Sequence, residues 1–208
     1  MIKDTLKSYK YFNFIYRRIL YPKLSQPEKD IYYLRDLNFN YSLDIGANVG
    51  TYSIELSKIS KKVIAFEPIK KIFKHTKEYL PKNVFLNNFA LGNCIKKQKI
   101  YTPLQKNLNI EYALSSIKNK PKHFISETVI IKKFDLIFKK KNFLDKIDFI
   151  KIDTEGYEHE IILGMKKFLK KNNPIFLIEI EKKHNKKFEK FFLLMKNLSY
   201  KVCIFDNK

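Results

Sequence analysis

Short apolar runs alternate along most of this chain with stretches whose apolar residues recur at helical spacing. The runs that predict buried strands end at Asp44 and span Lys62–Phe66, Val84–Leu86, Ile147–Ile152, Ile175–Ile180 and Val202–Phe205. Helical patterns lie between them, within residues 51–56, 69–80, 161–169 and 188–198. Strands that alternate with helices predict an α/β fold with a mostly parallel sheet and helices on both faces.

The remaining segments give weaker signals. Residues 93–126 are the least regular part, although Lys96–Tyr101 suggests an edge strand, and Thr128–Phe134 resembles a strand. Residues 1–24 are basic and aromatic without a clean helical stripe, so they fit a packed cap, a lid over the substrate or a peripheral membrane anchor. We favour the cap or lid. A capping box at Ser25–Glu28 predicts a helix to about Leu37, and a single domain then covers residues 25–208.

The first strand runs into a glycine turn, in the sequence LDIGANVG from Leu43 to Gly50. The whole chain has five glycines, and two of them, Gly46 and Gly50, lie in this turn, which therefore needs backbone freedom or close approach. A strand, a glycine turn and a helix N-terminus form a platform for a nucleoside-containing cofactor. The pattern is not the G-x-G-x-x-G of dinucleotide binding, which disfavours a nicotinamide dehydrogenase.

Glu67 directly follows the second strand. An acid at this position accepts hydrogen bonds from both hydroxyls of a ribose, and its distance from Gly50 along the chain is close to the expected one. The alternative is a solvated acid at the start of a helix that begins near Pro68. The combination with Asp44 and the glycine turn favours ribose binding. Asn87–Gly92 follows the third strand, where we expect a loop that contacts the adenine of such a cofactor.

Four acids, Asp44, Glu67, Asp153 and Glu179, lie at or near the carboxyl ends of predicted strands. Parallel strands place these ends at one edge of the sheet, and ligands of such sheets bind there. We therefore expect the functional site at this edge.

Composition limits the class of protein. With 208 residues, 45% of them hydrophobic, the chain is long enough for one globular domain. No apolar run approaches the roughly 20 residues of a membrane span, and the N-terminus lacks the layout of a signal peptide. Cys94 and Cys203 have no metal-binding spacing, which favours a reduced, cytoplasmic setting.

The formal net charge of +21 raises the question of a nucleic-acid partner. Only Arg17, Arg18 and Arg35 among the 42 basic residues are arginines, whereas phosphate and base recognition favours arginine, and the lysines are spread along the chain. We therefore interpret the charge as a solvated basic surface and disfavour nucleic acid. Weak contact of residues 1–24 with anionic lipid at the inner face of the membrane, or of the surface with anionic polysaccharide, remains an alternative.

Five segments together resemble the FkbM family of methyltransferases: LDIGANVGTYS (43–53), IAFEP (64–68), NFALGN (88–93), IDFIKIDTEGYEHEIILG (147–164) and IFLIEIE (175–181). The resemblance implies a Rossmann-like class I methyltransferase fold and S-adenosylmethionine-dependent O-methyl transfer (EC 2.1.1 class), often to hydroxyls of sugars or polyketides. It also implies roles by position. Asp44, Gly46, Asn48 and Gly50 would bind the methionine end of the cofactor, Glu67 the ribose, and Asn88 and Ala90 the adenine, with Asp153, Glu155 and Glu158 on the acceptor side.

Methyl transfer to a hydroxyl of a saccharide or glycolipid precursor benefits from a base that takes the hydroxyl proton. Asp153 is the first candidate, because it ends the strand beside the cofactor, and Glu155 is the second. Glu155 and Glu158 also fit acids that complement a helix N-terminus, the more so Glu158. A metal site formed by Asp153, Glu155, Glu179 and His159 is the less favoured mechanism, so we predict no metal.

Three other observations bear on the class. The turn Asp153-Thr154-Glu155-Gly156 lacks the Asp/Asn-Pro-Pro-aromatic pattern of amino-group methylation of bases, and Cys94 lies in the wrong loop for attack on a pyrimidine. A catalytically inactive basic module that binds an anionic polymer or membrane is the alternative to an enzyme.

Because the sequence ends three residues after Phe205, we expect one closing strand of the usual methyltransferase sheet to be missing or displaced.

Overall fold

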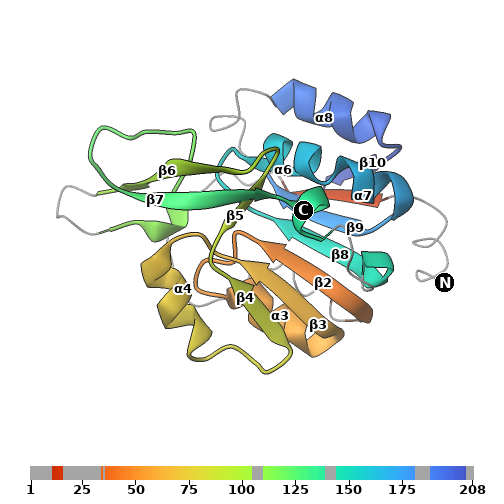
Figure 1. The fold of residues 1–208 in the computed structure, drawn as a ribbon. Coiled ribbons are helices and arrows are strands. Elements are labelled where there is room, and N and C mark those ends of the chain that lie inside the picture. Colours follow the sequence, from red (N-terminus) through yellow and green to blue (C-terminus); the bar gives the residue numbers. More distant parts are fainter. Residues whose placement is uncertain are drawn as a thin grey trace.

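The computed structural model describes residues 11–15, 34, 36–104, 110–138, 144–180 and 188–204. Their centre is a seven-stranded sheet in the order β10-β1-β9-β8-β2-β3-β4 (Figure 1). Its strands are β1 (Tyr11–Ile15), β2 (Phe39–Ile45), β3 (Ser60–Phe66), β4 (Val84–Asn87), β8 (Ile147–Ile152), β9 (Ile175–Glu179) and β10 (Lys201–Ile204). All neighbouring strands in this sheet run parallel, which confirms the predicted α/β fold.

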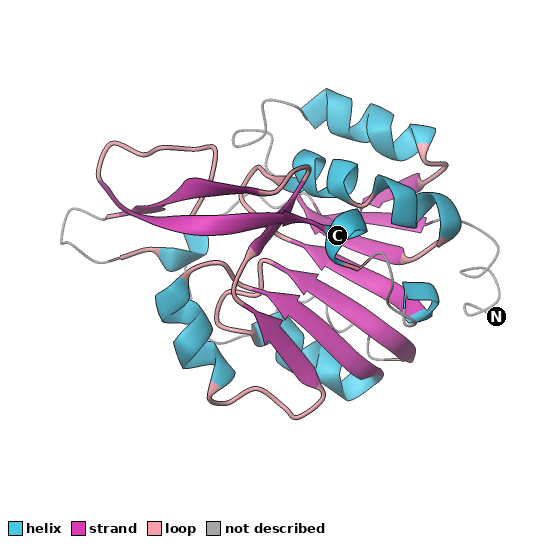
Figure 2. Ribbon diagram, in the orientation of Figure 1, coloured by secondary structure: helices cyan, strands magenta, loops and turns pink. Residues whose placement is uncertain are grey.

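Helices cover both faces of the sheet, as Figure 2 shows. They are α3 (Thr51–Ile59), α4 (Lys70–Lys77), α5 (Phe134–Ile137), α6 (Glu158–Gly164), α7 (Lys166–Lys171) and α8 (Phe188–Asn197). Alternate strand residues divide between two cores. Leu43 of β2 belongs to the cluster with α6, α7 and α8, whereas Phe149 of β8 belongs to the one with Tyr52 and Leu56 of α3.

The irregular segment after β4 forms a second, smaller sheet. Its strands are β5 (Ala90–Gly92), β6 (Lys96–Pro103) and β7 (Phe124–Lys133), in the order β5-β7-β6. The antiparallel pair of β6 and β7 extends beyond the central sheet in Figure 1. A short 3₁₀ helix at Tyr112–Leu114 follows β6, and the backbone of Ser116 then pairs with that of Tyr101. The predicted edge strand is therefore present, and the strand expected at Thr128 begins earlier, at Phe124.

Three expectations differ from the structure or lie outside it. The helix expected over residues 161–169 is divided at Met165 into α6 and α7. Residues 11–15, from the segment expected to be a cap, lid or anchor, instead form β1 between β9 and β10. The helix predicted from Ser25 and the boundary at residue 24 fall outside the described residues, apart from the end near Leu37. None of the helices that the structure describes is long and apolar enough to cross a membrane.

Candidate active site

The turn after β2 requires its glycines. Gly46 and Gly50 have φ of +85° and +76°, and Asn48 between them also has a positive φ of +48°. A Cβ on Gly46 would lie 1.8 Å from the backbone oxygen of Asp153, so the turns after β2 and β8 touch at this point. The amides of Gly46 and Ala47 both donate to the carbonyl of Phe66, which ties the turn to the end of β3.

Glu67 follows β3 and lines the pocket with a carboxylate that is almost fully buried, the residue being 4% exposed. The amide of Asn48 donates to Oε2 at 2.9 Å, and that of Ile69 donates to Oε1 at 2.7 Å. Burial raises the pKa of Glu67 to about 7, although the two backbone hydrogen bonds lower it. The alternative of a solvated acid is therefore wrong. Each oxygen keeps a lone pair for a ligand hydroxyl.

Asp44 lies fully buried beneath the glycine turn rather than in the pocket wall. Its Oδ2 accepts a hydrogen bond from Ser53 Oγ at 2.6 Å, and its Oδ1 lies 3.5 Å from Lys151 Nζ. The same ammonium lies 3.3 Å from Oδ2 of Asp153. Burial by itself would lower the pKa of Lys151, but the carboxylates of Asp153 and Asp44 outweigh it and raise the pKa above its usual value.

The turn after β8 presents two acids to the pocket. The amide of Asp153 donates to the carbonyl of Ile45, which places Asp153 beside the end of β2, and its side chain is 31% exposed. Glu155 has a positive φ of +50°, and its carbonyl accepts hydrogen bonds from Ser116 and Asn119. This contact fixes the turn to the segment that follows β6.

Glu158 does not reach the pocket. It is 1% exposed, and its Oε1 accepts hydrogen bonds from Thr154 Oγ1 at 3.0 Å and from the amide of Gly156 at 2.9 Å. Burial raises the pKa of Glu158. Glu158 thus stabilises the turn, in agreement with the interpretation that its role is structural.

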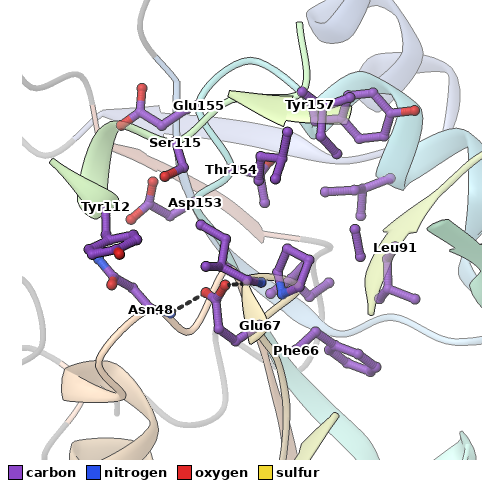
Figure 3. Close-up of a pocket in the computed structure, with 18 of the residues that line it drawn as sticks. Asn48, Phe66, Glu67, Leu91, Tyr112, Ser115, Asp153, Thr154, Glu155 and Tyr157 are labelled. Carbon is purple, nitrogen blue, oxygen red and sulfur yellow. Dashed lines mark hydrogen bonds between the residues drawn. The ribbon is translucent and has the colours of Figure 1, made fainter. Parts of the chain in front are cut away.

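The pocket opens at the carboxyl ends of β2, β3 and β8 (Figure 3). Of the ten predicted site residues, six line it, namely Gly46, Asn48, Glu67, Ala90, Asp153 and Glu155, and Glu158 does not reach it. The other three support its loops from behind. Asp44 lies beneath the turn, Gly50 precedes the first residue of α3, and the side-chain Nδ2 of Asn88 donates to the backbone carbonyls of Glu67 and Pro68.

One wall of the pocket has no counterpart in the motifs. Tyr112 and Ser115 come from the 3₁₀ helix and its C-cap, and in Figure 3 they lie on the side of Asp153, opposite Leu91. No spacing rule identifies such a wall, because Tyr112 and Ser115 are far along the chain from the motifs whose residues form the rest of the pocket. Lys151 was also missed as a site residue, but it did leave a signal, namely a lysine inside an apolar strand just before Asp153.

The four residues of the less favoured metal mechanism do not form a metal site in the structure. Within the ranges that the structure describes, no group of three His, Cys, Asp or Glu side chains is arranged to hold a metal ion. His159 Nδ1 lies 3.3 Å from Oε2 of Glu160 instead.

Comparison with known proteins identifies the family. The model of the methyltransferase FkbM domain matches residues 44–202, which is most of the chain. This chain belongs to the FkbM methyltransferase family. The matched region begins at Asp44 and includes every predicted site residue.

A crystal structure of methyltransferase FkbM from Methylobacillus flagellatus KT is also similar, with 14% sequence identity and a TM-score of 0.48. The similarity covers 76% of this chain and 37% of that one, so this FkbM family member spans little more than a third of the length of its neighbour. No curated protein matches the chain significantly.

Proposed function

We propose that this protein is an S-adenosylmethionine-dependent O-methyltransferase that acts on a hydroxyl of a saccharide, polysaccharide or glycolipid precursor. The observation that carries the proposal is Glu67, a buried carboxylate at the end of β3 that faces the pocket. Two backbone amides fix its direction, and each oxygen can still accept a hydrogen bond. This is the arrangement that a ribose with two neighbouring hydroxyls requires.

The residues around the glycine turn fit this cofactor. The Oδ1 atom of Asn48, in the pocket lining, has no hydrogen-bond partner among the described residues, so it is available to a donor such as the cofactor's amino group. The carboxylates of Glu67 and Asp153, which both line the pocket, favour a ligand with positive charge. When bound, S-adenosylmethionine supplies a methyl group on a sulfonium.

Asp153 is the candidate base for the acceptor hydroxyl. It lies in the pocket, and about a third of its side chain is open to solvent or ligand. Proton removal by such a group typically contributes 10²–10⁴-fold to the rate, and holding the reactants in line contributes about 7–11 kcal/mol of the barrier. Glu155 is the second candidate, since it lines the same pocket.

The pocket lining suits a hydroxylated acceptor. Tyr112 adds an aromatic side chain to the lining, while Ser115 and Glu155 add polar groups that suit hydroxyls. A few polar groups in a largely apolar wall is the usual composition of a small-molecule site.

Calorimetric titration with S-adenosylhomocysteine, with NAD as the negative control, tests the proposal. We expect binding of the first compound alone. Glu67→Ala is expected to weaken it by about 1.5–3 kcal/mol, the value of hydrogen bonds to a charged group. Glu78→Ala, which removes an exposed acid at the end of α4, is the matched control. Unchanged affinity in Glu67→Ala refutes the ribose assignment.

The second candidate is a catalytically inactive basic module that binds an anionic polymer or membrane surface, which the net charge of +21 favours. No binding of S-adenosylhomocysteine, together with salt-dependent binding to anionic vesicles, would support it. A cytoplasmic location, peripheral at the inner face of the membrane, belongs to the proposal and is tested by fractionation of cells that express the full chain.

A further inference from the structure

One strand position on the α3 face of the sheet is occupied by a buried cation. Lys151 is 4% exposed and lies in β8. Because side chains alternate between the two faces of a strand, Lys151 is on the same face as Phe149, which packs in the α3 core. The ring of Tyr52, from α3, lies 4.5 Å from its ammonium. An apolar side chain would fit this surface, because the rest of the α3 core is formed by apolar side chains.

The contacts of Lys151 join the two halves of the site. Asp44 is its register partner on β2, with 3.5 Å between Nζ and Oδ1. The ammonium also donates to the carbonyl oxygen of Gly46 at 3.3 Å and lies 3.3 Å from Oδ2 of Asp153. Glu179, at the end of β9, adds a further negative charge nearby. One cation thus contacts two carboxylates and the backbone of the glycine turn.

Stability alone does not account for this lysine. Replacing a buried ion pair with well-packed apolar residues is often neutral or even stabilising. A buried charge is therefore weak evidence for a role in folding, whereas its three polar contacts all belong to residues of the site.

We propose that Lys151 is a positioning residue that fixes the Asp153 carboxylate to the glycine turn at Gly46. The inference rests on the proposed function, since the turn would hold the cofactor and Asp153 would receive the acceptor proton. With Oδ2 of Asp153 engaged by the ammonium, the other carboxylate oxygen is left to meet the acceptor. The same contact sets the distance between the cofactor turn and the base.

The test compares Lys151→Met, Lys151→Arg and the control Lys62→Met. Lys62 also lies in a central strand with its ammonium 4.5 Å from an aromatic ring, that of Phe85, but it forms no ion pair with a carboxylate of the described residues. Lys151→Met should weaken S-adenosylhomocysteine binding roughly tenfold or more and move the carboxyl ¹³C resonance of Asp153. Lys151→Arg should restore both toward wild type, and Lys62→Met should change neither. A folded Lys151→Met protein with wild-type affinity and an unmoved resonance overturns the proposal.

A second measurement keeps the proposal testable if Lys151→Met does not fold. Asp153→Asn changes a partly exposed side chain, and it should move the ammonium ¹⁵N resonance of Lys151, whereas Glu155→Gln should not. An unmoved resonance in Asp153→Asn refutes the positioning role. If the wild-type protein binds no S-adenosylhomocysteine while this coupling is present, the proposed function fails but the contact between Lys151 and Asp153 stands.

Discussion

Replacing Gly46 with alanine should lower the stability of the folded protein and distort the pocket. The new Cβ would lie 1.8 Å from the backbone oxygen of Asp153, and real Cβ contacts essentially never fall below 3.0 Å. The backbone must therefore separate by about 1.2 Å (3.0 − 1.8) at the place where the turns after β2 and β8 meet. Neither atom belongs to a flexible side chain, so rotamer changes cannot relieve the overlap.

The magnitude follows from two contributions. A non-glycine residue at a φ of +85° costs about 1–3 kcal/mol, and overpacking against a rigid neighbour costs about 1–3 kcal/mol more. The sum of about 2–6 kcal/mol is a large part of the 5–15 kcal/mol that is typical of a domain. S-adenosylhomocysteine binding should fall as well, since the displaced backbone forms the pocket.

Gly50→Ala is the matched control. Its φ of +76° imposes a similar conformational cost, but its Cβ would meet only side-chain atoms, namely Thr76 Cγ2 at 2.9 Å and Leu80 Cδ2 at 3.0 Å. Shifts of a few tenths of an ångström relieve such contacts. Urea unfolding and calorimetric titration of both variants compare the two. Equal stability and equal affinity of Gly46→Ala and Gly50→Ala would refute the argument that the Asp153 backbone makes the turn intolerant.

Three other predictions concern Glu67, Asp153 and Phe149. The pKa of Glu67 is 4.5 in the unfolded chain and about 7 in the folded protein, so between these pH values the folded protein binds more protons than the unfolded chain. Its free energy of unfolding should therefore fall by up to about 3 kcal/mol as the pH rises from 4.5 to about 7. Glu67→Gln should flatten this slope in urea unfolding at a series of pH values, and an unaltered slope would contradict the assignment. Asp153→Asn should bind S-adenosylhomocysteine with an affinity close to that of wild type, but should lose about 10²–10⁴-fold in turnover in a methyl-transfer assay; full turnover would remove it as the base. Phe149→Ala deletes a fully buried ring that stacks on Phe39 at 4.9 Å, so it should cost about 3–5 kcal/mol in denaturant unfolding, and a loss below 1 kcal/mol would show that the α3 core collapses around the cavity.

The sequence by itself determined the parts of this protein that depend on local chemistry. Buried parallel strands are short apolar runs, so β3, β8 and β9 were found within two residues of their bounds, and the end of β2 within one residue. A turn with positive φ favours glycine, which is why the run from Gly46 to Gly50 indicated the site. Because parallel strands end at one edge, Glu67 and Asp153 were expected to meet, and both line the same pocket.

Only the tertiary structure decided which residues face the ligand and which lie behind it. Asp44 and Glu67 look alike in sequence as acids at strand ends, yet Asp44 is turned beneath the sheet edge toward Lys151, and Glu67 lines the pocket. The wall with Tyr112 and Ser115 brings a segment that is distant in sequence next to the motifs. The insertion of β1 between β9 and β10 likewise joins segments that are far apart along the chain. Local propensities contain no information on such pairings, because their free energy comes from surfaces that meet only when the whole chain has folded.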